Sequence, residues 1–105
     1  MNTIRVEIVA FVDSAQPGWV ECRLIDAMGE EWKFVEKVPV VTEAWLDENS
    51  KYPQQGFIAC EIIETWNDEH ARRLARICTE WPWGIESVRE RRTEFIVPAE
   101  MVVSV

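Results

Sequence analysis

The sequence is poor in the residues that build metal centres. It contains one histidine and three cysteines, the latter at positions 22, 60 and 78. A structural zinc site takes four cysteine or histidine ligands, usually as two closely spaced pairs, and these residues form no such pairs. A loop that holds a hard cation needs several acidic side chains around a glycine, and no acidic stretch has that pattern. We therefore expect no metal ion and no cofactor.

Known catalytic motifs are missing as well. The chain has no G-x-S-x-G elbow, no P-loop and no G-x-G-x-x-G turn. Cys78 and His70 are the nearest cysteine–histidine pair in the sequence. Their separation corresponds to about 26 Å along a strand or about 12 Å along a helix, which is too far for a catalytic dyad. The sequence thus predicts no catalytic residue, and its cysteines are expected to be buried thiols.

Membrane and secretion signals are also lacking. No apolar run approaches the length of a membrane span. The first residues, MNTIRVEIVAFVD, carry charges where a secretory signal peptide would be apolar. An odd number of widely spaced cysteines without such a signal is typical of a reducing compartment. We therefore expect a cytoplasmic protein that does not enter the membrane.

The charge is negative and unevenly distributed. The 105 residues carry a formal net charge of −8, but residues 72–105 hold six of the arginines. An acidic protein repels the phosphates of nucleic acids, so we expect no nucleic-acid partner and read the arginines as a solvated, ion-paired face. The length and the 48% content of hydrophobic residues predict a single globular domain over 1–105.

Alternation of apolar and polar residues predicts strands in most of the chain. In 3–13 the apolar positions fall on one face, and 19–25 and 30–38 alternate in the same way. The turn at 26–29 should join the last two as a hairpin, with Gly29 in a left-handed conformation. Further strands are expected at 57–66 and 94–97, the latter with an extension at 101–105.

Residues 67–81 fit two interpretations. As a strand, 72–79 would pair back onto 57–66 through a turn at 67–70. As a helix, 68–81 would place Leu74, Cys78 and Trp81 on one stripe. We favour the strand because the preceding elements are strands and the segment "ETWNDEHARR" is typical of a hairpin turn.

Five to six strands in a chain of this length predict an all-β fold. The expected architecture is a small antiparallel barrel or strongly curled sheet, of the size of SH3-like or OB-like domains. A short helix is expected near 42–46, and a helix at 68–81 would give the alternative, an α+β fold. The similarity to those barrels is one of strand count, and it carries no function.

Aromatic side chains are the best candidates for ligand contact. The chain has six tryptophans, and loops of small barrels use such rings to hold peptides, bases or cations. The alternative is that the rings close the ends of the core. In "CTEWPWGIES" (78–87) we expect one ring to cap the core and the other to be exposed. The candidate ligand-binding residues are Trp81, Trp83, Trp45, Tyr52 and Trp66.

Glu36 is the candidate for a perturbed carboxylate. It should share a strand face with Trp32 and Phe34, where an unpaired charge is costly. It would then either titrate at a raised pKa, as a general acid does, or form an ion pair with a base such as Arg23. The sequence leaves both outcomes open.

The function expected from these features is that of a non-catalytic module that binds a protein or peptide. The acidic charge would suit a cationic partner, and a homodimer is a further expected arrangement, since edge strands often pair. Two other functions remain open. One is an acidic regulatory protein that neutralises a basic partner, and the other is a small-molecule-binding or enzymatic barrel that uses a buried carboxylate.

Overall fold

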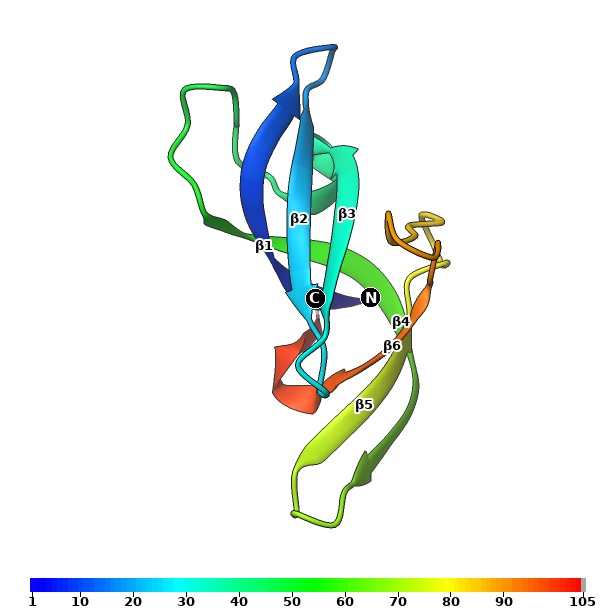
Figure 1. Cartoon of the computed structure of the whole chain (residues 1–105). Helices are drawn as coiled ribbons and strands as arrows, with labels where there is room; N and C mark the ends of the chain where they lie inside the picture. Colours follow the sequence, from blue (N-terminus) through cyan, green and yellow to red (C-terminus); the bar gives the residue numbers. More distant parts are fainter. Residues whose placement is uncertain (105) are drawn as a thin grey trace.

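The chain folds into one antiparallel sheet that curls into a half-barrel (Figure 1). The computed structural model describes residues 1–104, and Val105, the last residue of the predicted extension, lies outside them. The strands are β1 (Asn2–Asp13), β2 (Trp19–Ile25), β3 (Glu31–Lys37), β4 (Gln54–Asn67), β5 (Arg73–Cys78), β6 (Glu94–Pro98) and β7 (Val102–Ser104). Their order is β3-β2-β1-β4-β5-β6, with β7 paired to β1. The all-β prediction is confirmed.

The curl of the sheet follows from the way its strands share β1. One edge of β1 pairs with β4, and the other edge is divided between β7, which pairs with residues 2–4, and β2, which pairs with residues 7–13. Two backbone hydrogen bonds then bring the far ends of the sheet together. The N–H of Ala27, in the β2–β3 turn, donates to the carbonyl of Ile96 in β6 (2.9 Å), and the N–H of Val88 donates to the carbonyl of Lys33 in β3 (2.8 Å).

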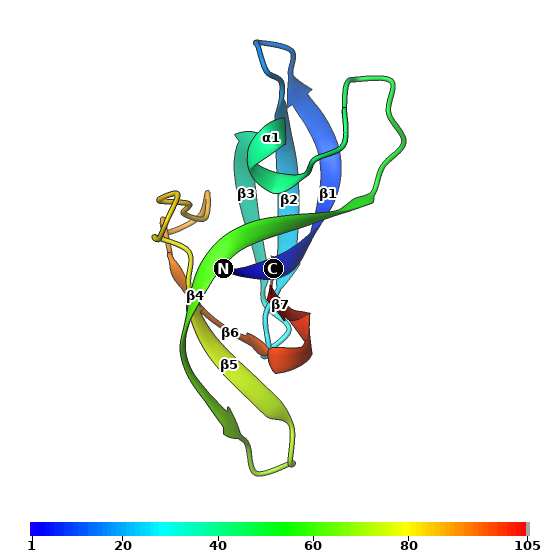
Figure 2. The ribbon, with the colours of Figure 1, turned by 180° about the vertical axis from the view of Figure 1, so that it is seen from behind.

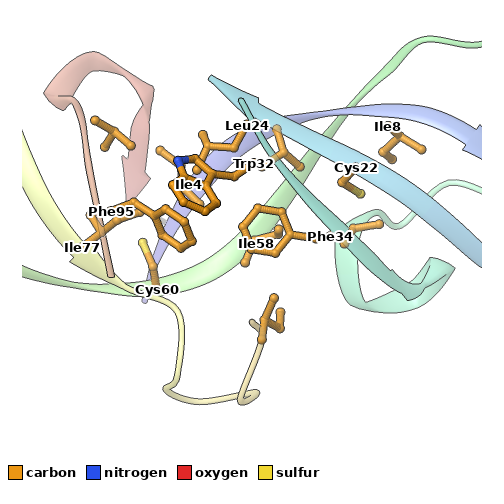
Figure 3. Close-up of a cluster of buried hydrophobic side chains, with 14 of the residues drawn as sticks. Ile4, Ile8, Cys22, Leu24, Trp32, Phe34, Ile58, Cys60, Ile77 and Phe95 are labelled. Atoms are coloured by element: carbon orange, nitrogen blue, oxygen red, sulfur yellow. The ribbon is translucent and has the colours of Figure 1, made fainter. Parts of the chain in front are cut away.

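The inner faces of the strands form the core (Figure 3). The predicted alternation is confirmed for β2, β3 and the first half of β1, where every second residue is buried along most of the segment. Beyond Ile8 the alternation of β1 ends, and Val12 is 48% exposed. Trp32 and Phe34 of β3 both pack edge-on against Phe95 of β6, with ring centroids 5.7 and 5.6 Å apart. Aromatic contacts between strands at opposite ends of the sheet therefore help to hold the half-barrel closed.

The two interpretations of residues 67–81 are resolved in favour of the strand. β5 pairs with β4 on one side and with β6 on the other, from Arg73 to Cys78. Arg76 is compatible with this strand because it lies outside the core, where its guanidinium donates to Glu64 of β4 at 2.8 Å. The helix considered at 68–81 does not form.

The structure has a short α-helix near the predicted position, but it lies at 38–41, before the predicted residues 42–46. α1 spans Val38–Val41 and contacts β3 and β4 (Figure 2). Pro39 has a fixed φ that suits the first turn of a helix, where its missing N–H is not needed. Thr42, the first residue of the predicted helix, is extended at φ −157° and ends α1. Among residues 1–104, the only other helix is the 3-10 turn η1 (Ala99–Met101), and neither is long and apolar enough to cross a membrane.

The β2–β3 and β4–β5 hairpins close with the same turn. In the first, the carboxylate of Asp26 accepts two backbone N–H groups, and Gly29 has a φ of +80°. The second repeats these bonds around Asp68, but Ala71 takes the place of the glycine at φ +61°. A left-handed φ is costly for any residue with a Cβ atom, so the second turn carries strain that the first does not.

Replacing Ala71 with glycine is therefore expected to stabilise the protein by about 1 kcal/mol. The reverse change, Gly29→Ala, should destabilise it by a similar amount. A Cβ atom at Gly29 would have no heavy atom within 4 Å. The change in the free energy of unfolding of Gly29→Ala therefore reports only the cost of placing alanine at a left-handed φ. Urea denaturation of both variants tests the prediction, and a destabilised Ala71→Gly protein would contradict it.

Candidate functional site

Two exposed tryptophans lie in the loop that follows β5. Trp81 is 64% exposed and Trp83 is 62% exposed, so the expectation that one of them caps the core is wrong. The loop closes the core without them. Buried Thr79 donates its hydroxyl to the carbonyl of Ile85 (2.6 Å), and the side chain of Ile85 enters the core. Both indole rings are consequently left at the surface.

Each of these rings lines a separate groove. The Trp83 groove has a volume of about 520 Å³ and is lined by Trp83 together with apolar residues that include Val40, Phe57, Ala59 and Val103. These residues come from α1, β4 and β7. The Trp83 groove is therefore a mainly apolar hollow assembled from segments that are distant in the sequence.

The Trp81 groove, of about 690 Å³, is lined by Trp81, Pro82 and Ile62 among others. Met1 lines both grooves, which makes them neighbours. One carboxylate lines each of them, Glu43 in the Trp83 groove and Glu61 in the Trp81 groove, and no lysine or arginine lines either. The two grooves together combine exposed indole rings, apolar walls and two carboxylates, and Met1, which lines both, carries the N-terminal amino group.

The other three aromatic candidates do not join this surface. Trp45, 79% exposed, and Tyr52 belong to the 42–53 loop, whereas Trp66 lies near the end of β4. The loop and the β4–β5 hairpin form opposite ends of the molecule (Figure 1). Tyr52 packs against the core, and its hydroxyl donates to the carbonyl of Asp47 at 2.8 Å, which orders the loop. The five predicted residues thus do not form one site, and only Trp81 and Trp83 lie at neighbouring grooves.

Glu36 is half-buried, and it does not form the ion pair suggested for it. Arg23 instead binds Glu7, at 2.6 Å. The pKa of Glu36 is raised above its ordinary value, mainly by burial and also by the negative charge of Glu86, while Lys37 acts in the opposite direction. Glu36 lines neither the Trp83 groove nor the Trp81 groove. Its raised pKa thus follows from its burial and from the nearby charge of Glu86.

Replacing Glu36 with glutamine is expected to stabilise the protein at neutral pH. A carboxyl group whose pKa is raised on folding favours the folded state only when protonated, so its contribution is present at low pH and is lost as the pH rises through the folded pKa. The gain of the variant should vanish below about pH 4, near the pKa of an unperturbed glutamate. Denaturation from pH 4 to 8, with exposed Glu48→Gln as the control, checks this, and an equal gain at all pH values would contradict it.

Two of the three cysteines, Cys22 and Cys60, are buried thiols as expected, whereas Cys78 is only half-buried. Burial raises the pKa of Cys22 to about 12 and that of Cys60 to about 11, so both remain protonated, weakly nucleophilic thiols at neutral pH. His70 is exposed in the β4–β5 turn, where its Nε2 lies 3.6 Å from a carboxylate oxygen of Glu69. Within residues 1–104 there is no cluster of three or more cysteine, histidine or acidic residues that could hold a metal ion.

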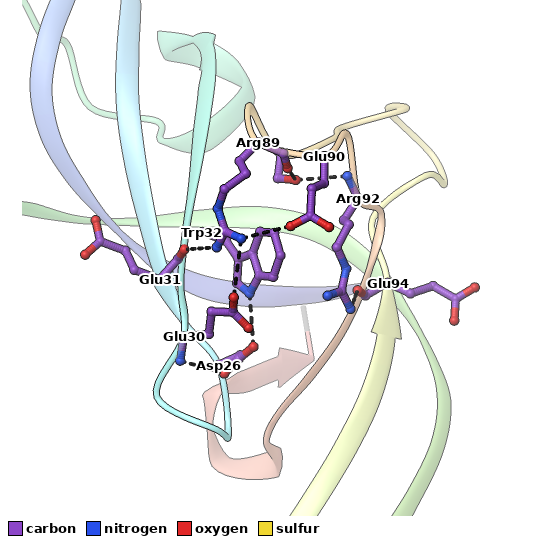
Figure 4. A network of polar contacts seen from close by, with 9 residues as sticks. Asp26, Glu30, Glu31, Trp32, Arg89, Glu90, Arg92 and Glu94 are labelled. Atoms are coloured by element: carbon purple, nitrogen blue, oxygen red, sulfur yellow. Dashed lines mark hydrogen bonds and ion pairs between the residues drawn. The ribbon is translucent and has the colours of Figure 1, made fainter.

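The arginines near the C-terminus are engaged within the chain. Four of them pair with carboxylates: Arg72 with Asp68, Arg76 with Glu64, Arg89 with Glu30 and Glu90, and Arg91 with Glu86. Arg89 and Arg92 also stack over the ring of Trp32 (Figure 4). The expectation that these arginines are ion-paired is therefore confirmed for four of the six.

The Trp81 and Trp83 grooves are the site that sequence reasoning located only in part. It identified the two rings from their position beside Pro82 and Gly84. It missed the walls, because Val40, Phe57 and Val103 become neighbours only in the folded sheet. Compared with known proteins, the chain matches no family model, no curated protein and no solved structure.

Proposed function

We propose that the protein is a non-catalytic binding module whose Trp81 and Trp83 grooves take a segment of a partner protein or peptide. The observation that carries the proposal is the exposure of both indole rings, 64% and 62%, beside apolar grooves. Contiguous apolar surface in water is unfavourable, and monomeric proteins expose it mainly where they bind something. Tryptophan is also among the residues that contribute most to binding energy at protein interfaces.

The charge around the grooves supports a cationic partner. Glu43 and Glu61 line them without any basic side chain, and the whole chain has a net charge of −8. Arginine and lysine pack their aliphatic stems on apolar surface and place their charge over an aromatic ring. The protein uses this contact internally, since the guanidinium carbon of Arg89 lies 3.9 Å from the ring centroid of Trp32. The proposed partner segment therefore alternates basic and apolar side chains.

Three short peptides test this proposal. The sequences Leu-Arg-Leu-Arg, Leu-Gln-Leu-Gln and Leu-Glu-Leu-Glu, each acetylated, amidated and fluorescently labelled, would be titrated with the protein and followed by anisotropy. We expect the arginine peptide to bind most tightly and the glutamate peptide most weakly. Equal binding of the arginine and glutamate peptides, or no saturable binding of the arginine peptide, would refute the proposal.

Two further measurements separate this function from the alternatives. A protein that acts by charge neutralisation alone should lose affinity for its partner steeply as the salt concentration rises. A protein that holds the arginine peptide by indole rings and apolar walls should instead retain most of its affinity. Sedimentation velocity tests for a homodimer. A dimer that shields both rings from acrylamide quenching would assign the grooves to self-association and overturn the peptide proposal.

A further inference from the structure

A third hollow lies at a different part of the half-barrel. This hollow, the Arg5 cleft, has a volume of about 610 Å³ and shares no lining residue with the Trp81 and Trp83 grooves. Its polar side chains include Arg5, Glu7, Arg23 and Gln55, and its apolar wall includes Met101. A cleft of this size is in the range that holds small organic ligands.

The carboxylates of the Arg5 cleft are already bound by the protein. Glu7 accepts a hydrogen bond from Arg23 at 2.6 Å. Asp26 also lines the cleft, but one of its oxygens accepts two backbone N–H groups of its turn and the other accepts the indole N–H of Trp32 at 3.0 Å. Neither acid is available to balance another positive charge.

Arg5 is the charge in the cleft that lacks a counter-ion. Arg5, Arg23 and Arg76 are the half-buried arginines of the described chain, and the other two bind Glu7 and Glu64 at 2.6 and 2.8 Å. The Nε–H groups of all three lack an acceptor, but Arg5 alone has no carboxylate partner and donates to the carbonyl of Glu100 (3.0 Å). A guanidinium offers five N–H donors, and partial burial without a counter-charge is costly. Arg5 is therefore the cation of the cleft without a counter-ion, and its guanidinium has N–H donors left for a bound anion.

We propose that the Arg5 cleft binds a small organic carboxylate with an apolar stem. Arginine binds carboxylates through two parallel N–H···O bonds, and the side-chain amide of Gln55 is a further donor in the cleft. The stem would pack against the apolar wall formed by Ile25, Pro98 and Met101. This site is separate from the peptide grooves and has the opposite charge preference.

Hexanoate, hexanamide and hexylammonium are matched probes for this site, because they share a stem and differ in charge. Added to 15N- and 13C-methyl-labelled protein, hexanoate is expected to give saturable NMR shifts of the Arg5 Nε–H and the Met101 methyl group. The other two probes should bind at least about 10-fold more weakly. No saturable shift up to about 20 mM hexanoate, or equal binding of hexanoate and hexanamide, would overturn the proposal.

Variants locate the site and keep the test independent of the peptide grooves. Arg5→Gln keeps a polar N–H donor but has no charge, and should weaken hexanoate binding at least about 10-fold, while Trp83→Ala should leave it unchanged. Retained affinity in a folded Arg5→Gln protein would refute the role of Arg5. Should that variant fail to fold, the comparison of the three probes on the wild-type protein still decides whether the cleft selects a carboxylate. The affinity of the peptide Gly-Leu-Leu, with a free or an amidated C-terminus, is then compared with that of hexanoate. This comparison shows whether the cleft binds the C-terminal carboxylate of a peptide better than a small organic acid.

Discussion

Replacing Trp32 with alanine is expected to destabilise the protein by about 3–5 kcal/mol, the range for a fully buried aromatic side chain. A domain of this size is stable by only about 5–15 kcal/mol, so the variant should be close to unfolding. Trp32 is 1% exposed and packs edge-on against Phe95. Its removal would leave a cavity between β3 and β6, two strands that lie at opposite ends of the sheet.

The effect should exceed that of an ordinary core truncation because Trp32 joins three segments (Figure 4). Its indole N–H donates to Asp26 in the β2–β3 turn at 3.0 Å. Arg89 and Arg92, from the loop before β6, lie over its ring at 3.9 and 4.6 Å, and Arg89 also donates to the backbone carbonyl of Glu31 in β3 (2.8 Å). Without the ring, the two arginines of this loop lose the side chain of β3 on which they pack.

Urea denaturation measures this effect, with two matched controls. Trp32→Phe keeps an aromatic surface for the arginines and loses the indole N–H, so we expect a smaller loss of about 1–2 kcal/mol. Trp45→Ala removes a tryptophan that is 79% exposed and should change the stability by less than about 0.5 kcal/mol. A Trp32→Ala protein as stable as the Trp45→Ala protein would contradict the role given to Trp32.

Replacing Trp83 with alanine is expected to weaken binding of the arginine peptide by about 30-fold, the loss typical of a residue that dominates an interface. The stability should change little, because the ring is exposed and the loop is held by Thr79 and by backbone hydrogen bonds. Together these outcomes would separate a binding residue from a structural one.

Two further variants sharpen the interpretation of the Trp83 result. Trp45→Ala removes a ring of similar exposure that lines neither groove, and it should keep the affinity within about 2-fold, as expected of a residue outside the interface. Trp83→Phe keeps part of the aromatic surface and should fall between alanine and the wild type. If Trp45→Ala and Trp83→Ala weakened binding equally, the peptide would be held by charge or by general hydrophobicity, and the grooves would not be its site.

The strands could be predicted from the sequence because their signal is local. Alternation with a period of two identifies a half-buried strand without knowledge of its neighbours, and Asp26 with Gly29 marks a turn that needs few other contacts. The short helix was predicted four residues too late, near 42–46, although Pro39 fits the first turn of a helix and marks its actual start.

The candidate site depended on contacts that no local pattern contains. Whether a tryptophan caps a core or faces solvent depends on what else fills the space, and here Ile85 fills it instead of Trp81 or Trp83. Arg23 has Glu7 as its partner because β1 and β2 place the two residues directly opposite each other. Strand pairing, rather than composition, thus decides which charges remain free.

The indole N–H signals of the six tryptophans provide the most direct test of the binding surface. With 15N-tryptophan-labelled protein and assignments from single Trp→Phe variants, the arginine peptide is expected to shift the signals of Trp81 and Trp83. The signals of Trp32, which is buried and bound to Asp26, and of Trp45 should stay in place. Saturable binding that leaves Trp81 and Trp83 unshifted, or shifts Trp45 as much, would contradict the proposal that these grooves hold the partner.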